Sequence, residues 1–169
     1  MSPIDQKYLA LLNYARTKEE RDELIELLTI LDQSLVSGGE GALEHTLTQN
    51  IPQEIADALK EVMTHSGLAR NGAETRALLK DLVALLNALP LLKMDLACRP
   101  TEEMIAHLYG WVGEHVGAGT VMDIGYDASL IGGARISYNG RYKEVTLAQA
   151  ITAALSQERK DLFTTIGLL

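Results

Sequence analysis

The residues that could do chemistry in this chain are few and widely spaced. Asp123 and Asp127 lie four positions apart in a strand-like run, so their carboxylates share one face of a strand and could form an acid–base pair. Asp123 lies inside this predicted strand, and Asp127 lies in the turn that follows it. Because turn and strand-edge roles explain the two aspartates without any reaction, we expect no catalytic residue here.

The histidines do not have the spacing of a metal site. His107 and His115 lie eight positions apart on a predicted helix, a little over two turns, which is too far for one ion. His45 and His65 stand isolated between polar neighbours. The sequence therefore predicts no metal ligands.

Motifs for nucleotide binding and covalent catalysis are also missing. No G-x-x-x-x-G-K-[ST] loop is present, and the Gly-Glu-Gly run at 39–41 lacks the third glycine of a dinucleotide loop. No serine or cysteine has the context of a nucleophile elbow. The single cysteine, Cys98, excludes an internal disulfide, and we expect it to be a small buried side chain. The prediction is a protein that is not an enzyme, with no catalytic, cofactor-binding or metal residues and no cofactor.

Composition and charge restrict the partners. A chain of 169 residues with 47% apolar residues can build a real core. Its net charge of −8, without a dense Lys/Arg cluster, argues against nucleic acid. Charges run throughout the first two dozen residues and no apolar run could span a bilayer, so we expect a cytoplasmic protein without direct membrane insertion.

The predicted secondary structure that positions these residues changes once along the chain, from helices alone to a mixture of strands and helices. Up to about residue 89, apolar residues recur every three or four positions, which predicts helices separated by breaks near 37–41, 50–52 and 66–72. Four helices are expected, the first long or broken near 15–18. Residues 1–87 are therefore predicted to form a helical bundle domain.

After Pro90 the pattern is mixed. Alternation predicts a strand over 91–98, Thr101 is a good N-cap for a helix with an apolar stripe over 104–116, and strands follow over 120–126 and 130–138. Asn139-Gly140 predicts a hairpin turn into a fourth strand, and a last helix is expected from about 146 to 161. The fold class is thus α+β, a helical bundle followed by a small α/β module (β-α-β-β-β-α) over residues 88–169.

Two adjacent glycines interrupt the third predicted strand. Glycine inside a strand costs backbone entropy, so we expect a neighbouring backbone or bend to pass too close for a side chain. Asp127 and Ser129, just upstream, can bond the backbone of their own turn. This structural motif comprises Asp127, Ser129, Leu130, Ile131, Gly132 and Gly133.

The run Asp-Ala-Ser-Leu-Ile-Gly-Gly at 127–133 resembles the C-terminal module of the delta subunit of F-type ATP synthases, called the oligomycin-sensitivity-conferring protein in mitochondria. The helix start Arg-Pro-Thr-Glu-Glu at 99–103 and the Thr146-Leu147 step follow the family's order over roughly residues 90–150. Residues 1–89 resemble the family only as a helical bundle, shorter than the six helices expected of it.

The resemblance implies a non-catalytic connector in the peripheral stalk of a bacterial-type synthase. In that family the N-terminal bundle grips an N-terminal segment of an alpha subunit, the C-terminal module holds the b-subunit helices, and the protein resists torque. The implied partners are the alpha subunit and the b subunits. The implied location is the inner face of the cell membrane, held there through the complex.

Two other classes stay open. E-like stalk subunits of vacuolar or archaeal-type ATPases also end in an α/β module with a glycine pair, but they begin with a long charged coiled coil, and this chain has no sustained heptads beyond Leu24 to Leu35. A generic protein-interaction adaptor is the third class.

The last eight residues carry five large apolar groups. They either fold back onto the sheet or bundle, or clamp a b-subunit helix beside residues 104–116. The candidate partner-binding residues are Leu162, Phe163, Ile166, Leu168 and Leu169.

Overall fold

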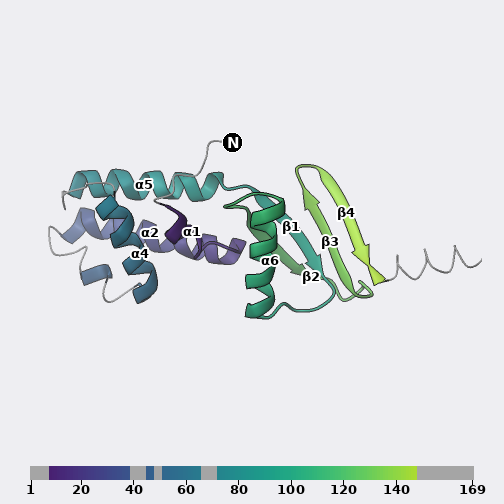
Figure 1. The fold of residues 1–169 in the computed structure, drawn as a ribbon. Helices are drawn as coiled ribbons and strands as arrows, with labels where there is room; N and C mark the ends of the chain where they lie inside the picture. Colours follow the sequence, from purple (N-terminus) through teal and green to yellow (C-terminus); the bar gives the residue numbers. More distant parts are fainter. Residues whose placement is uncertain (1–7, 39–44, 48–50, 66–71, 148–169) are drawn as a thin grey trace, which may run out of the picture. The chain divides into compact units, whose positions relative to one another are not determined.

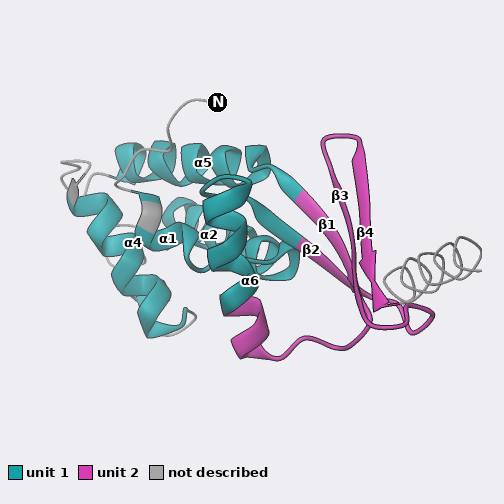
Figure 2. Cartoon of the chain, turned by 45° about the vertical axis from the view of Figure 1, so that its right-hand side comes forward, with its two compact units in different colours: residues 1–91, 107–122 teal, residues 92–106, 123–169 magenta. Residues whose placement is uncertain are grey.

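A computed structural model describes residues 8–38, 45–47, 51–65 and 72–147 of the chain (Figure 1). The chain forms two compact units, coloured separately in Figure 2: unit 1 is residues 1–91 and 107–122, and unit 2 is residues 92–106 and 123–169. The units interleave along the chain, so they differ from the consecutive domains 1–87 and 88–169 expected from periodicity. Independent folding of those two ranges stays a prediction.

The order of elements confirms the α+β fold class. Helices come first, and a β-α-β-β-β order follows in the second half of the chain. The elements are α1 (Leu9–Leu12), α2 (Lys18–Gly38), α4 (Gln53–His65), α5 (Gly72–Ala88), β1 (Leu91–Leu96), α6 (Glu102–His115), β2 (Val121–Tyr126), β3 (Gly133–Tyr138) and β4 (Arg141–Thr146). Of the predicted final helix only the first two residues are described: Thr146 ends strand β4 instead, and Leu147 follows it, while the rest lies outside the described residues.

The expected break near 15–18 separates α1 from α2, and a reciprocal cap fixes it. Glu20 N donates to Thr17 Oγ1 at 3.2 Å, and Thr17 N donates to Glu20 Oε2 at 3.1 Å. Each side chain thereby satisfies a backbone N–H that the start of a helix leaves unpaired. Burial raises the pKa of Glu20, but the ion pair and hydrogen bonds with Arg16 and the backbone bond from Thr17 together hold this pKa below its usual range.

Thr17→Ala is expected to lower the free energy of unfolding by about 1 kcal/mol, because alanine cannot accept the Glu20 N–H bond. Thr29→Ala is the matched control, since the exposed Thr29 hydroxyl only donates to a carbonyl one turn back within α2. Urea denaturation measures both. Equal stability of Thr17→Ala and the parent would contradict the role of this cap.

The leucines of the helical repeat form the core of unit 1. Leu24, Leu28 and Leu31 of α2 are at most 1% exposed, at the spacing of three and four that puts them on one face. α2 packs against α5, whose buried face carries Leu79, Leu82 and Leu86 among others. Arg76 of α5 also donates to Asp32 of α2 at 2.7 Å. The apolar stripe of α2 is therefore used inside its own bundle.

A four-stranded sheet with the order β2-β1-β3-β4 contains all the strands in the described part of the chain. β1 pairs antiparallel with β3, so that Asp95 lies opposite Arg135, and β3 pairs antiparallel with β4. Leu92, Met94 and Leu96 are buried, as the alternation in β1 predicts. Asn139 and Gly140 have φ of 48° and 73°, the left-handed pair that a two-residue hairpin turn requires.

β1 and β3 are shorter than predicted. β1 ends at Leu96, where Asp127 N donates to the Leu96 carbonyl, and the chain then bends away. Cys98 is exposed, so the expectation of a buried thiol is wrong. Past the end of β1 the strand alternation stops, so it no longer directs the side chain of Cys98 towards the core. β3 begins only at Gly133, because the residues before it form a turn instead of the predicted strand.

Candidate functional site

The Asp-x-Ser turn of the sequence motif is formed as expected. Asp127 Oδ1 accepts hydrogen bonds from Ser129 N at 2.9 Å and from Ser129 Oγ at 2.6 Å. Leu130 N donates to the Asp127 carbonyl at 3.2 Å, and the Leu130 side chain is buried while Ile131 is exposed. The aspartate thus shapes the turn between β2 and β3.

The two glycines have left-handed backbones, with φ of +69° at Gly132 and +85° at Gly133. A Cβ on Gly133 would lie 1.9 Å from the Val145 carbonyl oxygen, a backbone atom that a side-chain shift cannot move. At Gly132 a Cβ would lie 3.2 Å from Leu147 Cβ. The close approach expected of the pair is therefore found at Gly133, where β4 passes over the turn.

Backbone bonds tie this turn to two strand ends. Ala97 N, just after β1, donates to the Gly133 carbonyl at 3.1 Å, and Leu147 N, just after β4, donates to the Ile131 carbonyl at 3.0 Å. The four residues 130–133 therefore join the ends of two strands that are not neighbours in the sheet. Small size at Gly132 and Gly133 is what allows that junction.

Arg135 gathers the charges on one face of the sheet. Its Nη1 donates to Asp127 Oδ2 at 3.0 Å, and Asp95 and Glu144 lie within 4 Å on the strands to either side. Tyr142 completes the group by donating its hydroxyl to Glu144 at 2.8 Å. All these side chains are at least partly exposed. The arrangement is a cross-strand ion-pair network, and Asp127 has its oxygens engaged by the turn and by Arg135.

The hydrogen bonds from Ser129, and then Arg135, hold the pKa of Asp127 below its ordinary value. A carboxyl whose pKa is lower in the folded state stabilises the fold above its unfolded pKa, and this contribution is lost as pH falls through the folded value. Asp127→Asn is therefore expected to be less stable than the parent near neutral pH. Thermal melts from pH 7 down to pH 2 should show the difference vanishing in acid, whereas a constant difference would contradict it.

Unit 1 carries a groove that sequence reasoning missed. It is an open depression between α4 and the end of α1 with a volume of about 380 Å³, and Ala10, Tyr14 and Ala58 are the more buried of its lining residues. The rim is acidic on the α4 side and carries Asn13 on the other. The acidic residues are Glu54, Asp57 and Glu61. Their spacing of three and four along α4 is the signal that could have indicated a common face.

α6 exposes part of its predicted apolar stripe. Thr101 caps this helix as predicted, since Met104 N donates to Thr101 Oγ1 at 3.3 Å. Within the predicted apolar stripe over 104–116 Val112 is buried, but Met104 and Trp111 are 36% and 45% exposed. The Trp111 ring stacks on the His115 ring with 4.7 Å between centroids. Met104 and Trp111 lie at the edge of the helix face that carries Val112, which leaves both side chains exposed. The prediction of a single buried stripe is therefore wrong for these two residues.

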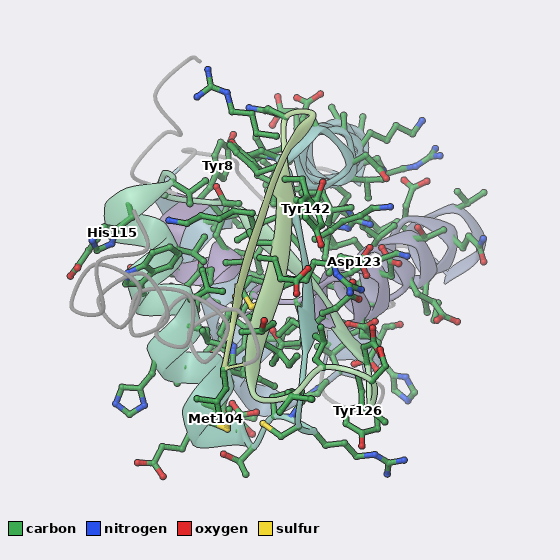
Figure 3. All side chains as sticks on the ribbon, turned by 90° about the vertical axis from the view of Figure 1, so that its right-hand side faces the viewer. Tyr8, Met104, His115, Asp123, Tyr126 and Tyr142 are labelled. Atoms are coloured by element: carbon green, nitrogen blue, oxygen red, sulfur yellow. The ribbon has the colours of Figure 1, made fainter. Side chains whose placement is uncertain are left out.

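Two tyrosines of the sheet are also exposed. Tyr126 at the end of β2 is 53% exposed and lies against the guanidinium of Arg99, 5.8 Å from the ring centroid, while Tyr142 is 59% exposed (Figure 3). The partner-binding residues predicted in the tail, Leu162 to Leu169, lie outside the described residues.

In the described ranges, no group of three or more His, Cys, Asp or Glu side chains is placed to hold a metal ion. No helix in that part of the chain is both long and apolar enough to cross a bilayer.

Comparisons with known proteins do not assign a family. No model of a known protein family matches the chain, and a search of the curated proteins finds no match.

Proposed function

We propose that this protein is a non-catalytic connector of the peripheral stalk of a bacterial-type F-type ATP synthase, comparable to the delta subunit. It joins the alpha subunits of the catalytic head to the b-subunit stalk and resists the torque between them. Through that complex it is held at the inner face of the cell membrane.

The observation that carries the proposal is the turn at 127–133. The resemblance predicts a helix, a strand and then the Leu-Ile-Gly-Gly run, and this is the order in which α6, β2 and the turn follow one another. The glycines allow the turn to bind the ends of β1 and β4 through backbone hydrogen bonds. A module that transmits force benefits from strand ends fixed to each other in this way.

Two features of unit 1 support a connector over the E-like alternative. Leu24, Leu28 and Leu31 of α2 are buried in the core of the bundle, so this apolar stripe is not available to a coiled-coil partner. The groove beside α1 and α4 is a suitable place for a segment of another chain. A connector needs such a grip on the head as well as a surface for the stalk.

Co-purification tests the proposal. The full chain is immobilised and offered, from the source organism, the alpha subunit, the soluble part of the b subunit, or both. We expect capture of each alone and bridging of the two. Failure to capture either subunit would overturn the proposal, and capture of a vacuolar-type stalk subunit instead would favour the E-like class.

Calorimetry with ATP gives an independent check. Because the sequence contains no phosphate-binding loop, we expect no heat of binding and no hydrolysis by the isolated chain. Micromolar nucleotide binding would contradict a purely mechanical role.

A further inference from the structure

We infer that the free edge of β4 binds an extended strand of another protein, in which two apolar and then two acidic residues stand at alternate positions. β4 is the last strand in the order of the sheet and its outermost arrow in Figure 1. The opposite edge strand, β2, already has a bridge from Met122 to Thr17. This inference goes beyond the proposed function and does not depend on whether the chain is a stalk connector.

The register of the hairpin fixes which residues of β4 bond to β3. Tyr138 and Arg141 flank the two-residue turn, and in such a hairpin these two residues exchange backbone hydrogen bonds. Bonded and non-bonded pairs alternate along an antiparallel ladder, so Lys143 and Val145 also bond to β3. Leu147 continues the alternation, because its N–H bonds to the turn that precedes β3.

Tyr142 and Glu144 consequently direct their backbone N–H and C=O groups to the open edge. These four groups can pair with one more strand, the mode of recognition called β-strand addition. The Tyr142 side chain is 59% exposed, so its ring also offers apolar area to a strand seated there. We expect an antiparallel strand, since antiparallel pairing is slightly more stable per residue.

Four side chains on one face of β4 determine the chemistry of the occupant. They are two cations and then two apolar groups: Arg141, Lys143, Val145 and Leu147. All four are exposed, and as alternate residues they follow one another about 7 Å apart along the strand. No ion pair joins Arg141 or Lys143 to any residue that the structure describes. An antiparallel partner that matches this face carries two apolar residues followed by two acidic ones.

The chain itself does not contain this complement, which favours another protein over a second copy. Its only acidic residues at alternate positions are Glu20 and Asp22, and each is already paired with an arginine of unit 1. If two β4 strands paired antiparallel, Arg141 and Lys143 could lie opposite only a cation or an apolar residue, because opposite residues share a face. Cations at a sheet edge thus oppose self-pairing while they attract a foreign acidic strand.

Backbone bonds and apolar contacts supply most of the expected affinity. Exposed ion pairs contribute little each, and the net charge of −8 repels an acidic strand at long range. The two cations therefore determine which strand fits the edge.

Fluorescence anisotropy of labelled peptides with the full chain tests the inference. The probe is Val-Thr-Val-Thr-Glu-Thr-Glu, which matches β4 in the antiparallel direction. One variant has Lys in place of both Glu, a second has N-methyl groups on the last two Thr, whose N–H groups face β4, and a third has them on the second Val and first Glu, which face away. The probe and the third variant should bind at least tenfold more tightly than the other two, which is 1.4 kcal/mol. Binding of the Lys peptide or the second variant as tightly as the probe would overturn the inference.

Matched variants of the chain locate the site. Arg141→Gln with Lys143→Gln should remove the tenfold preference for the Glu over the Lys peptide. Lys93→Gln with Arg99→Gln removes the same charge from exposed positions elsewhere in unit 2 and should leave the preference intact. Circular dichroism checks that both variants are folded. Equal losses in the two double variants would overturn the site.

Hydrogen exchange of backbone amides is the direct readout of strand addition. A saturating amount of the probe should slow exchange at Tyr142 and Glu144 at least tenfold, and should change Lys143 less, because its N–H is already bonded to β3. Unchanged exchange at Tyr142 and Glu144 would overturn the inference. A dimer of the parent chain that the probe dissociates would show that a second copy occupies the edge, and would overturn it as well.

Discussion

Gly133→Ala is expected to lower the free energy of unfolding by about 2–4 kcal/mol. A left-handed backbone costs an alanine about 1–2 kcal/mol, and here the φ is +85°. The new Cβ would also meet the Val145 carbonyl oxygen at 1.9 Å, so β4 must move away and weaken its ladder with β3. Urea denaturation of the full chain measures the loss.

Two other glycines separate the contributions. Gly140 has a φ of +73°, and an added Cβ there would have nothing within 4 Å, so Gly140→Ala should cost only the backbone term, about 1 kcal/mol. Gly110 in α6 has an ordinary helical backbone and open space, so Gly110→Ala should raise stability by about 0.5–1 kcal/mol. A Gly133→Ala variant no less stable than Gly140→Ala would show that β4 does not pass over the turn.

Leu31→Ala is expected to lower the free energy of unfolding by about 3 kcal/mol, because it leaves a cavity in the core of unit 1. Leu31 is 0% exposed, whereas the neighbouring Ile30 is 39% exposed on the other side of α2. Ile30→Ala is the matched control and should cost less than about 1 kcal/mol. Equilibrium unfolding of both variants checks the difference.

The same pair distinguishes a bundle from a stalk coiled coil. If the apolar stripe of α2 formed an intermolecular seam, Leu31→Ala would change the oligomeric state and make the melting temperature depend on protein concentration. In the bundle, sedimentation of the variant and the parent should be the same. A loss of oligomer on Leu31→Ala would argue for the E-like class.

Elements with strong local signals were predictable from the sequence. The half-buried alternation of β1, the Asn139-Gly140 turn and the Thr101 cap each depend on neighbours within a few residues, and all three are present in the structure. Local chemistry also predicted the Asp127–Ser129 turn. The fold class could be predicted because it follows from such elements taken in order.

Features that depend on distant contacts were not predictable. Strand-like composition at 130–132 indicated β structure, but these residues form a turn in which Gly132, like the following Gly133, is left-handed, and β4 passes close to Gly133. Exposure of Cys98 depends on where the pairing of β1 ends, and the last backbone bonds there are to Asp127 and Gly133, far along the chain. The groove in unit 1 depends on the packing of α1 beside α4, for which periodicity alone gives no register.

The two-residue turn at Asn139 and Gly140 also sets the order in which the sheet can assemble. β3 and β4 have only to close this turn, which for hairpins takes on the order of microseconds. β1 can pair with β3 only after α6 and β2, which lie between them in the sequence, have been synthesised. The loop that joins β1 to β3 is therefore longer than the hairpin turn, and closing it costs more chain entropy. On the ribosome, Leu92, Met94 and Leu96 therefore emerge well before the hairpin that covers their strand's edge, and β1 stays without its β3 partner until that hairpin has been synthesised.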